Sequence, residues 1–441
     1  MTRIVVAASA VYGHFAPMRS IAADLVGRGH QVTVLTGSVY RDEVRATGAA
    51  FAAVDGAADF VFAEKAADPE RLALPVGPAQ LDWDVRNIFL QSVPGQHSAL
   101  QRVLADAPGE PVVLLAETGF AGALPVMLGA PGHRPAAVVG IGVLPLTISS
   151  VDTAPFGMGL PPDYSKEGRA RNRELNAAMQ NQVLGDAQRL FAGILADLGC
   201  PDRPPFFMDA PLSEADVFLQ LSVEELSYRR TDLPEHVHFI GRLPADPGTG
   251  TRLPHWWADV LDAERVVVVT QGTLANLDLG KLIEPAVEAL ADERVLVVAA
   301  TGTDREVRGV PANARVTPFI PFELLLPHTD LLITNGGFGG VQQALAHGVP
   351  MVLAGQSEDK LESNVRVAAT GAAVNLGTDT PSPIDIRKAV DTVLSEPGYR
   401  QNAARLRADY AVSDALDVID TTIRRLVSRR ATTFMTLRSE R

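Results

Sequence analysis

Residues 319–367 read FIPFELLLPHTDLLITNGGFGGVQQALAHGVPMVLAGQSEDKLESNVRV, and this stretch decides the fold. Its apolar run at 331–334 is ended by the glycines of NGGFGG, and residues 341–347 follow with helical spacing. The order is therefore strand, glycine-rich turn and helix. N–H groups at a helix start attract anions and glycines let a ligand approach the backbone, so this turn suits a phosphate. Many Gly-Gly pairs only shape a turn, and the ordered context on both sides gives this one its weight.

The composition is that of an ordinary globular protein. The chain has 441 residues, enough for two domains, with 46% apolar and 21% charged residues. Its 39 basic and 52 acidic residues give a net charge of −13, which argues against nucleic acid or an anionic membrane as the main partner. No apolar run approaches the roughly 20 residues of a membrane span. The single cysteine, Cys200, excludes an intramolecular disulfide, and we expect a cytoplasmic protein.

Strand and helix patterns alternate in the first half of the chain. Continuous apolar runs at 3–10 and 31–37 enclose a helical pattern, which is the unit of a parallel sheet. Residues 110–130 and 133–146 continue the series. Ligands bind at the carboxyl ends of such strands, so the segment after the first strand and Glu117 after a later one are expected at one edge.

A second alternating series follows a linker rich in Pro and Gly at 243–254, with strand patterns at 265–273 and 294–302. We predict an α/β protein of two Rossmann-like, doubly wound parallel-sheet domains that face each other across a cleft. The predicted parts are 1–226 and 227–410, each of which could hold one substrate, and 411–441, a C-terminal helix packing back on the first domain plus a frayed basic tail.

Two segments carry a resemblance to a known family. VYGHFAPMRSIAADLVGRGHQVTVLTG at 11–37, together with residues 319–376, resembles GT-B glycosyltransferases of the UDP-glycosyltransferase type (family 1), which include bacterial antibiotic glycosyltransferases. The likeness in layout covers nearly the whole chain. The wording NGG, VQQALAHG and EDK is most similar to actinobacterial enzymes that resemble rifamycin glycosyltransferases.

Several positions depart from the pattern of this family. Asn335 stands where the family has a His facing phosphate, so an amide donor would replace an imidazole. Gly340 stands where a Ser or Thr hydroxyl usually meets phosphate, which leaves only backbone N–H groups. Gln343 stands for the Glu that accepts ribose hydroxyls, and Phe319 for the Trp that stacks on the nucleobase.

The acidic end of the motif is partly retained. Asp359 keeps the acid that binds sugar hydroxyls, while Lys360 replaces Gln and Ser363 replaces Asn, which puts the identity of the donor in doubt. The resemblance implies a donor site made of Thr273, Phe319, Ile320, Asn335, Gly337, Phe338, Gly339, Gly340, Gln343, Asp359 and Lys360. Thr273 as a plain strand cap is an equally open interpretation.

His14 and Glu117 are the candidate catalytic residues. Sugar transfer with inversion needs a base for the acceptor hydroxyl, and His14 follows the first strand with an unperturbed pKa near 6.5. The G-H match to the family supports this role, and Glu117 would orient the imidazole unless it is only a loop or cap residue. Asp82 and Asp84 have DxD-like spacing, but we interpret them as a solvated pair, with no metal site and no cofactor.

The resemblance implies an inverting, metal-independent glycosyltransferase. It would move a hexose from a UDP- or dTDP-sugar to a hydroxyl of an apolar small molecule such as a rifamycin-like polyketide. Residues 60–96 and 140–198 would line the acceptor pocket, unless they are ordinary covering helices. Two alternatives stay open: a nucleotide-sugar epimerase, which would lack a large apolar pocket in the first domain, and a non-catalytic or auxiliary GT-B protein.

Overall fold

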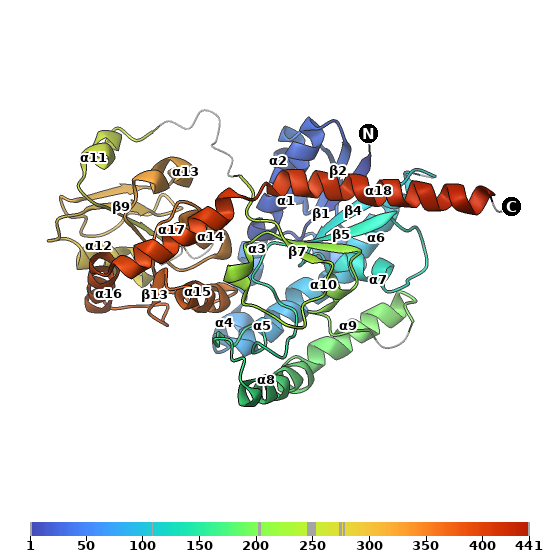
Figure 1. Ribbon diagram of the computed structural model, residues 1–441, viewed down its shortest axis with the longest axis horizontal. Coiled ribbons are helices and arrows are strands. Elements are labelled where there is room, and N and C mark those ends of the chain that lie inside the picture. Colours follow the sequence, from blue (N-terminus) through green and yellow to red (C-terminus); the bar gives the residue numbers. More distant parts are fainter. Residues whose placement is uncertain are drawn as a thin grey trace.

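A computed structural model describes residues 2–107, 109–201, 204–244, 253–272, 276 and 278–439, with side chains described to 429. It contains two parallel sheets, and each is surrounded by its own helices (Figure 1). No helix within these ranges is long and apolar enough to cross a membrane.

The first sheet has seven strands in the order β3-β2-β1-β4-β5-β6-β7. All its neighbouring strands are parallel. The strands are β1 Arg3–Ala7, β2 Gln31–Thr36, β3 Ala50–Ala53, β4 Val112–Glu117, β5 Ala137–Gly142, β6 Val217–Gln220 and β7 Val237–Phe239. Side chains of β1 alternate between two cores: Ile4 and Val6 join one, Val5 and Ala7 the other. Helices therefore cover both faces, which explains the continuous apolar runs.

The second sheet has six parallel strands in the order β10-β9-β8-β11-β12-β13. The strands are β8 Val266–Thr270, β9 Leu296–Ala300, β10 Ala314–Thr317, β11 Leu331–Thr334, β12 Met351–Leu353 and β13 Ala373–Asn375. Along β8, Val266 and Val268 enter one core while Val267 and Val269 enter the other. The predicted fold class, two doubly wound α/β domains, is confirmed.

The helices of the first domain include two π-helical segments, Val85–Leu90 and Met179–Val183, each continuing an α-helix. The α-helices are α1 Tyr12–Gly27, α2 Arg41–Ala46, α3 Phe62–Ala66, α4 Pro69–Ala73, α5 Pro78–Asp84, α6 Gln91–Ala105, α7 Leu124–Met127, α8 Lys166–Ala178, α9 Gly185–Asp197 and α10 Ala210–Ser213. π-Helical turns are rare and occur mostly at functional sites.

The helices that follow the linker surround the second sheet, except the last. They are α11 Trp257–Asp262, α12 Ile283–Ala289, α13 Phe322–Leu325, α14 Phe338–Ala346, α15 Lys360–Ala369, α16 Pro383–Ser395, α17 Pro397–Ala411 and α18 Ala415–Ser439. α14 begins at Phe338, three residues earlier than the helical spacing predicted, so its first turn is built from the glycine run itself.

The expected domain boundary at 226/227 lies too early. β7 at Val237–Phe239 pairs with β6, so the first sheet extends past residue 226. A three-residue strand carries no sequence signal for the sheet it joins. The linker residues 245–252 lie outside the described residues.

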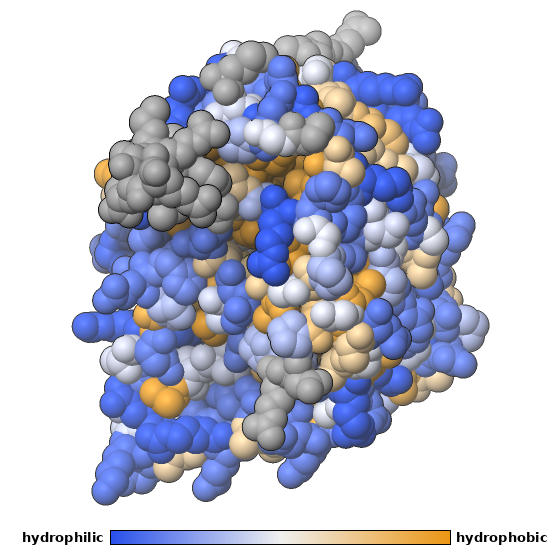
Figure 2. All heavy atoms as spheres, turned by 90° about the vertical axis from the view of Figure 1, so that its right-hand side faces the viewer, coloured by the Kyte–Doolittle hydropathy of each residue, from blue (hydrophilic) through white to orange (hydrophobic). Residues whose placement is uncertain are grey.

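α18 runs back from the second domain across the first (Figure 1). Ala415, Ile419 and Ile423 enter the core beneath β1, and Asp420 meets the buried His30 at 2.8 Å. The helix continues to Ser439, so the tail expected to fray is helical as far as it is described. The face of the first domain away from the second is mostly hydrophilic, with apolar residues gathered toward its centre (Figure 2).

Candidate active site

His14 and Glu117 lie together at the carboxyl edge of the first sheet. Nδ1 of His14 is 2.6 Å from Oε2 of Glu117, although the two residues are 103 positions apart. β1 and β4 are neighbours in the sheet, which is why the segments that follow them meet. His14 lies in the first turn of α1, and both side chains are buried.

The backbone holds the Glu117 carboxylate in a fixed orientation. Ser9 N–H donates to Oε1 at 2.9 Å, and Gly119 N–H donates to Oε2 at 2.6 Å. A Cβ at position 119 would lie 2.8 Å from Nδ1 of His14, so only glycine leaves room for the imidazole. Phe89, on the first π-helical segment, packs beside the His14 ring with a centroid separation of 5.8 Å.

The charges of this pair stabilise each other. Burial alone would lower the pKa of His14, but the charge of Glu117 and its hydrogen bond outweigh burial and raise that pKa, with a further contribution from Asp359. Burial would raise the pKa of Glu117, but His14 and the two backbone N–H groups lower it. The carboxylate therefore stays ionised and fixes the proton on Nδ1, which leaves Nε2 as the basic atom.

Asp359 of the second domain interacts electrostatically with His14 of the first. It directly precedes α15 in the second domain, yet its charge reaches His14 in the first. Burial raises the pKa of Asp359, and its own N–H, the charge of His14 and the N–H of Phe338 offset part of this rise. The acid expected to bind sugar is therefore close enough to His14 for their charges to interact.

The turn before α14 is open to a ligand. A Cβ placed on Gly337, Gly339 or Gly340 would meet nothing within 4 Å. α14 has no side-chain cap at Gly337, and the N–H groups of its first turn have no intrahelical acceptor; that of Phe338 is engaged by Asp359, which leaves those of Gly339 and Gly340. This space and these donors suit the oxygens of a diphosphate.

Asn335 does not offer the amide donor that the sequence predicted for phosphate. Its Nδ2 donates to the backbone oxygen of Gln271, while its buried Oδ1 has no partner among the described residues. Thr273, the other predicted contact near Gln271, lies outside the described residues. The amide thus ties the turn after β11 to the end of β8.

Asn364, the neighbour of Ser363, forms the side-chain hydrogen bonds at this turn. Asn364 Nδ2 donates to the backbone oxygens of Asn335 at 3.2 Å and Gly355 at 2.9 Å. Gly336 has φ +91°, and a Cβ there would lie 1.6 Å from Oδ1 of Asn364. Ser363 Oγ is buried without a partner in the described part of the chain. The sequence missed Asn364 because one residue of helical register separates the two positions.

Three apolar residues predicted to contact the nucleotide sugar differ in exposure: Phe319 is exposed, whereas Ile320 and Phe338 are buried. Phe319 is 70% exposed on the loop after β10, with its backbone oxygen held by Thr317 Oγ1 at 3.0 Å. An exposed aromatic face is what a nucleobase needs for stacking. Ile320 and Phe338 instead bury their side chains in the core of the second domain, so only their backbones can meet a ligand. Gln343 is half-buried on α14.

Lys360 carries a charge that is already partnered. Its side chain is buried, and Nζ contacts Glu358 Oε2 and, at 3.4 Å, Ser357 Oγ. Burial lowers the pKa of Lys360 to about 8. The charge of Asp379 opposes this fall, and the charge of Arg71 adds to it. Glu358 has φ 54°, a strained value for a residue with a side chain. The ammonium therefore forms part of the donor loop itself.

The segments predicted to line the acceptor pocket form one apolar cluster. Side chains of α5, the first π-helical segment and α6 pack against α7, the second π-helical segment and α9. Leu81, Val93, Met158, Met179 and Phe191 belong to this cluster. We call this cluster the acceptor wall. The first π-helical segment, which contributes to it, also carries Phe89, whose ring packs beside that of His14.

The DxD-like carboxylates are each paired with an arginine. Asp82 meets Arg86 at 2.7 Å, and Asp84 meets Arg71 at 2.6 Å. No group of three or more His, Cys, Asp and Glu side chains within the described residues is placed to hold a metal ion. A cavity of about 670 Å³ lies behind α15, lined by Tyr228 and Ser413 among others, and contains none of the predicted site residues.

The chain is similar to known proteins over nearly its whole length. The family described as "Erythromycin biosynthesis protein CIII-like, C-terminal domain" matches residues 282–421. The chain is 41% identical to "UDP-glycosyltransferase 2" of Phaeomoniella chlamydospora over 94% of each chain. It is 40% identical to "4'-demethylrebeccamycin synthase" of Lentzea aerocolonigenes, covering 95% of this chain and 98% of that one. The crystal structure of the glycosyltransferase of kitacinnamycin matches with a TM-score of 0.72 at 22% identity, over 97% of this chain and 100% of that one.

Proposed function

This chain is a glycosyltransferase of the UDP-glycosyltransferase family with the GT-B fold, and we propose that it transfers a hexose from a UDP- or dTDP-sugar to a hydroxyl of an apolar small molecule. The acceptor class is an aromatic or polyketide natural product, with rifamycin-like polyketides among the candidates. The relative named "4'-demethylrebeccamycin synthase" supports a natural-product acceptor.

The observation that carries the proposal is the buried His14–Glu117 pair facing Asp359 of the other domain. Nε2 of His14 takes the proton from the acceptor hydroxyl as its oxygen forms a bond to C1 of the sugar. The bond between C1 and the diphosphate oxygen breaks at the same time, and its electron pair leaves with the nucleotide. A single displacement of this kind inverts the configuration at C1.

The leaving nucleotide is met by the backbone of the second domain. The N–H groups of Gly339 and Gly340 lie beside the open space that the diphosphate would fill, whereas that of Phe338 is engaged by Asp359. Fixed dipoles at this place stabilise the charge that develops as the bond breaks, which supports transfer without a metal. Phe319 stacks on the base and Asp359 accepts hydroxyls of the sugar.

The test incubates the protein with UDP-glucose or dTDP-glucose and a panel of planar phenols and aromatic polyketides, with and without EDTA. We expect nucleotide release that requires an acceptor, a product heavier by one hexose, and equal rates with EDTA. NMR of the product should show a β-linkage from the α-linked donor. No nucleotide release above the acceptor-free rate across the panel would contradict the proposal.

A further inference from the structure

Glu362 of the second domain forms hydrogen bonds to a loop of the first domain, residues 146–165. Its Oε1 accepts the backbone N–H of Gly157 at 3.0 Å and that of Gly159 at 2.8 Å. Both glycines have positive φ, +92° and +59°, and Glu362 is buried. A buried carboxylate that accepts two backbone N–H groups fixes both its own position and that of the loop.

The same helix reaches the loop at two further points. Arg366 Nη2 donates to the backbone oxygen of Leu146 at 3.0 Å and lies 3.3 Å from Glu362 Oε2. A Cβ on Gly159 would lie 2.6 Å from Cγ of Leu361, so the loop and α15 touch directly. α15 starts directly after Asp359, and its orientation therefore joins the donor acid to this loop.

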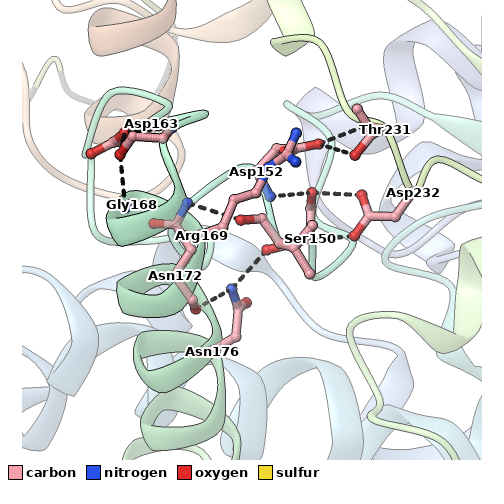
Figure 3. A network of polar contacts seen from close by, with 11 residues as sticks. Ser150, Asp152, Asp163, Gly168, Arg169, Asn172, Asn176, Thr231 and Asp232 are labelled. Atoms are coloured by element: carbon pink, nitrogen blue, oxygen red, sulfur yellow. Dashed lines mark hydrogen bonds and ion pairs between the residues drawn. The ribbon is translucent and has the colours of Figure 1, made fainter.

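The loop is equally tied to the elements of the first domain. Asp152 accepts hydrogen bonds from Arg169 of α8 at 2.8 Å and from the N–H and hydroxyl of Thr231 (Figure 3). Ser150 donates to Asp232 at 2.7 Å, and Asn176 of α8 donates to the backbone of Ser150 at 3.1 Å (Figure 3). α8 runs on into the second π-helical segment, so hydrogen bonds tie the loop to that part of the acceptor wall.

Gly157 also touches α5 on its other side. A Cβ at Gly157 would lie 2.9 Å from Cδ2 of Leu81, which belongs to the acceptor wall. A cavity of about 30 Å³ separates α5 and Gly157 from Glu358 and Leu361. α5 continues into the π-helical segment that carries Phe89 to the His14 ring. Apart from this cavity, packed segments connect α15 through Gly157 and α5 to the ring of His14.

We infer that Glu362 is a positioning residue that couples donor binding to the acceptor wall through Gly157 and Gly159. When the diphosphate and sugar order the start of α15, the carboxylate draws the loop and α5 into the arrangement that an acceptor binds. Linkage requires the converse as well, so an acceptor tightens nucleotide binding by the same factor. The inference rests on the proposed donor site.

The experiment measures amide hydrogen exchange of residues 146–165 with and without saturating UDP, beside the Kd of UDP from calorimetry. In the wild-type protein UDP slows exchange in this loop, by about 5-fold or more. In Glu362→Ala the UDP-dependent slowing disappears while the Kd of UDP stays within about threefold. Gly159→Ala, which attacks the contact from the first domain, has the same effect.

Two variants serve as matched controls. Glu362→Gln keeps an oxygen for both glycine N–H groups and retains the slowing. Glu225→Ala removes another ion pair between the two parts of the chain, that with Arg405, without touching the loop, and it also retains the slowing.

A kinetic readout separates positioning from loss of structure. With UDP-glucose and an accepted phenol, Glu362→Ala raises the acceptor KM at saturating donor about 5- to 50-fold and, by the same linkage, raises the donor KM at saturating acceptor, while the Kd of UDP without acceptor stays within about threefold. Persistent slowing in Glu362→Ala, or no slowing in the wild type despite UDP binding, would overturn the coupling alone. Absence of UDP binding to the wild type would overturn the donor site and the coupling with it.

Discussion

Replacing Glu117 with Gln tests the catalytic pair with the least change of shape. The carboxylate accepts three hydrogen bonds: Ser9 N–H on Oε1, and Gly119 N–H with His14 Nδ1 on Oε2. An amide has one oxygen, so one of the two backbone N–H groups must face an NH₂ group in either orientation. The orientation that directs NH₂ at His14 also places the proton on Nε2, where the base must be free.

The expected loss follows from the charge. A hydrogen bond to a charged group contributes about 1.5 to 3 kcal/mol, and the imidazolium formed during transfer loses that support. Since 1.36 kcal/mol is tenfold in rate, kcat should fall roughly 10- to 200-fold. The carboxylate raises the pKa of His14 against burial. Its removal therefore lowers this pKa, and the acid limb of the pH–rate profile moves to lower pH.

The assay measures kcat and kcat/KM for acceptor-dependent nucleotide release from pH 5 to 9. Glu323→Gln is the matched control, because Glu323 forms a second His–Glu contact, 3.1 Å from His347, away from the cleft. It should leave the acid limb in place. A Glu117→Gln enzyme with kcat within about twofold of wild type, or an acid limb shifted to higher pH, would refute the reasoning.

Three further predictions concern the donor site and the C-terminal helix. Phe319→Ala should weaken UDP binding by about 1 to 2 kcal/mol, roughly 5- to 30-fold, whereas Phe319→Trp should bind at least as well as wild type; calorimetry decides, and unchanged affinity in the Ala variant would exclude stacking. Asn335→His should leave UDP affinity intact or improve it, because the present amide spends its donor on Gln271; a clear loss would show that this loop is built differently from the family. Asp420→Asn should cost about 1 to 2 kcal/mol of unfolding free energy at pH 7. Arg424 and His30 outweigh burial and lower the pKa of Asp420, so its contribution is present above the unfolded pKa and is lost as pH falls through the folded value. Thermal unfolding should therefore differ between the two proteins at pH 7 and converge as the pH falls through the folded pKa of Asp420, and a constant difference would contradict the linkage.

Periodicity was sufficient for the architecture because its strands are buried on both faces. The unbroken apolar runs of β1, β4 and β8 need no tertiary information to be recognised. The meeting of His14 and Glu117 also followed from a rule, since carboxyl ends of neighbouring parallel strands share one edge. Their backbone support from Ser9 and Gly119 depends on turn geometry that the sequence does not display.

Contacts between distant segments could not be predicted. Asn335 was expected to meet phosphate, but its amide bonds to a strand end 64 residues away. Asn364 was not singled out, although its amide holds the turn through the backbone oxygens of Asn335 and Gly355, because helical register decides which side chain faces the turn. Glu362 escaped attention because its partners are backbone N–H groups of two glycines more than 200 residues earlier.

His14→Ala tests the central claim most directly, when UDP affinity and acceptor-dependent UDP release are measured on the same preparation. We expect release to fall by about 10²-fold or more, since general base catalysis contributes 10²–10⁴, while the Kd of UDP stays within about threefold. The N–H groups proposed to bind the diphosphate lie in the other domain and do not depend on the imidazole. Turnover near the wild-type rate would contradict the assignment of His14 as the base.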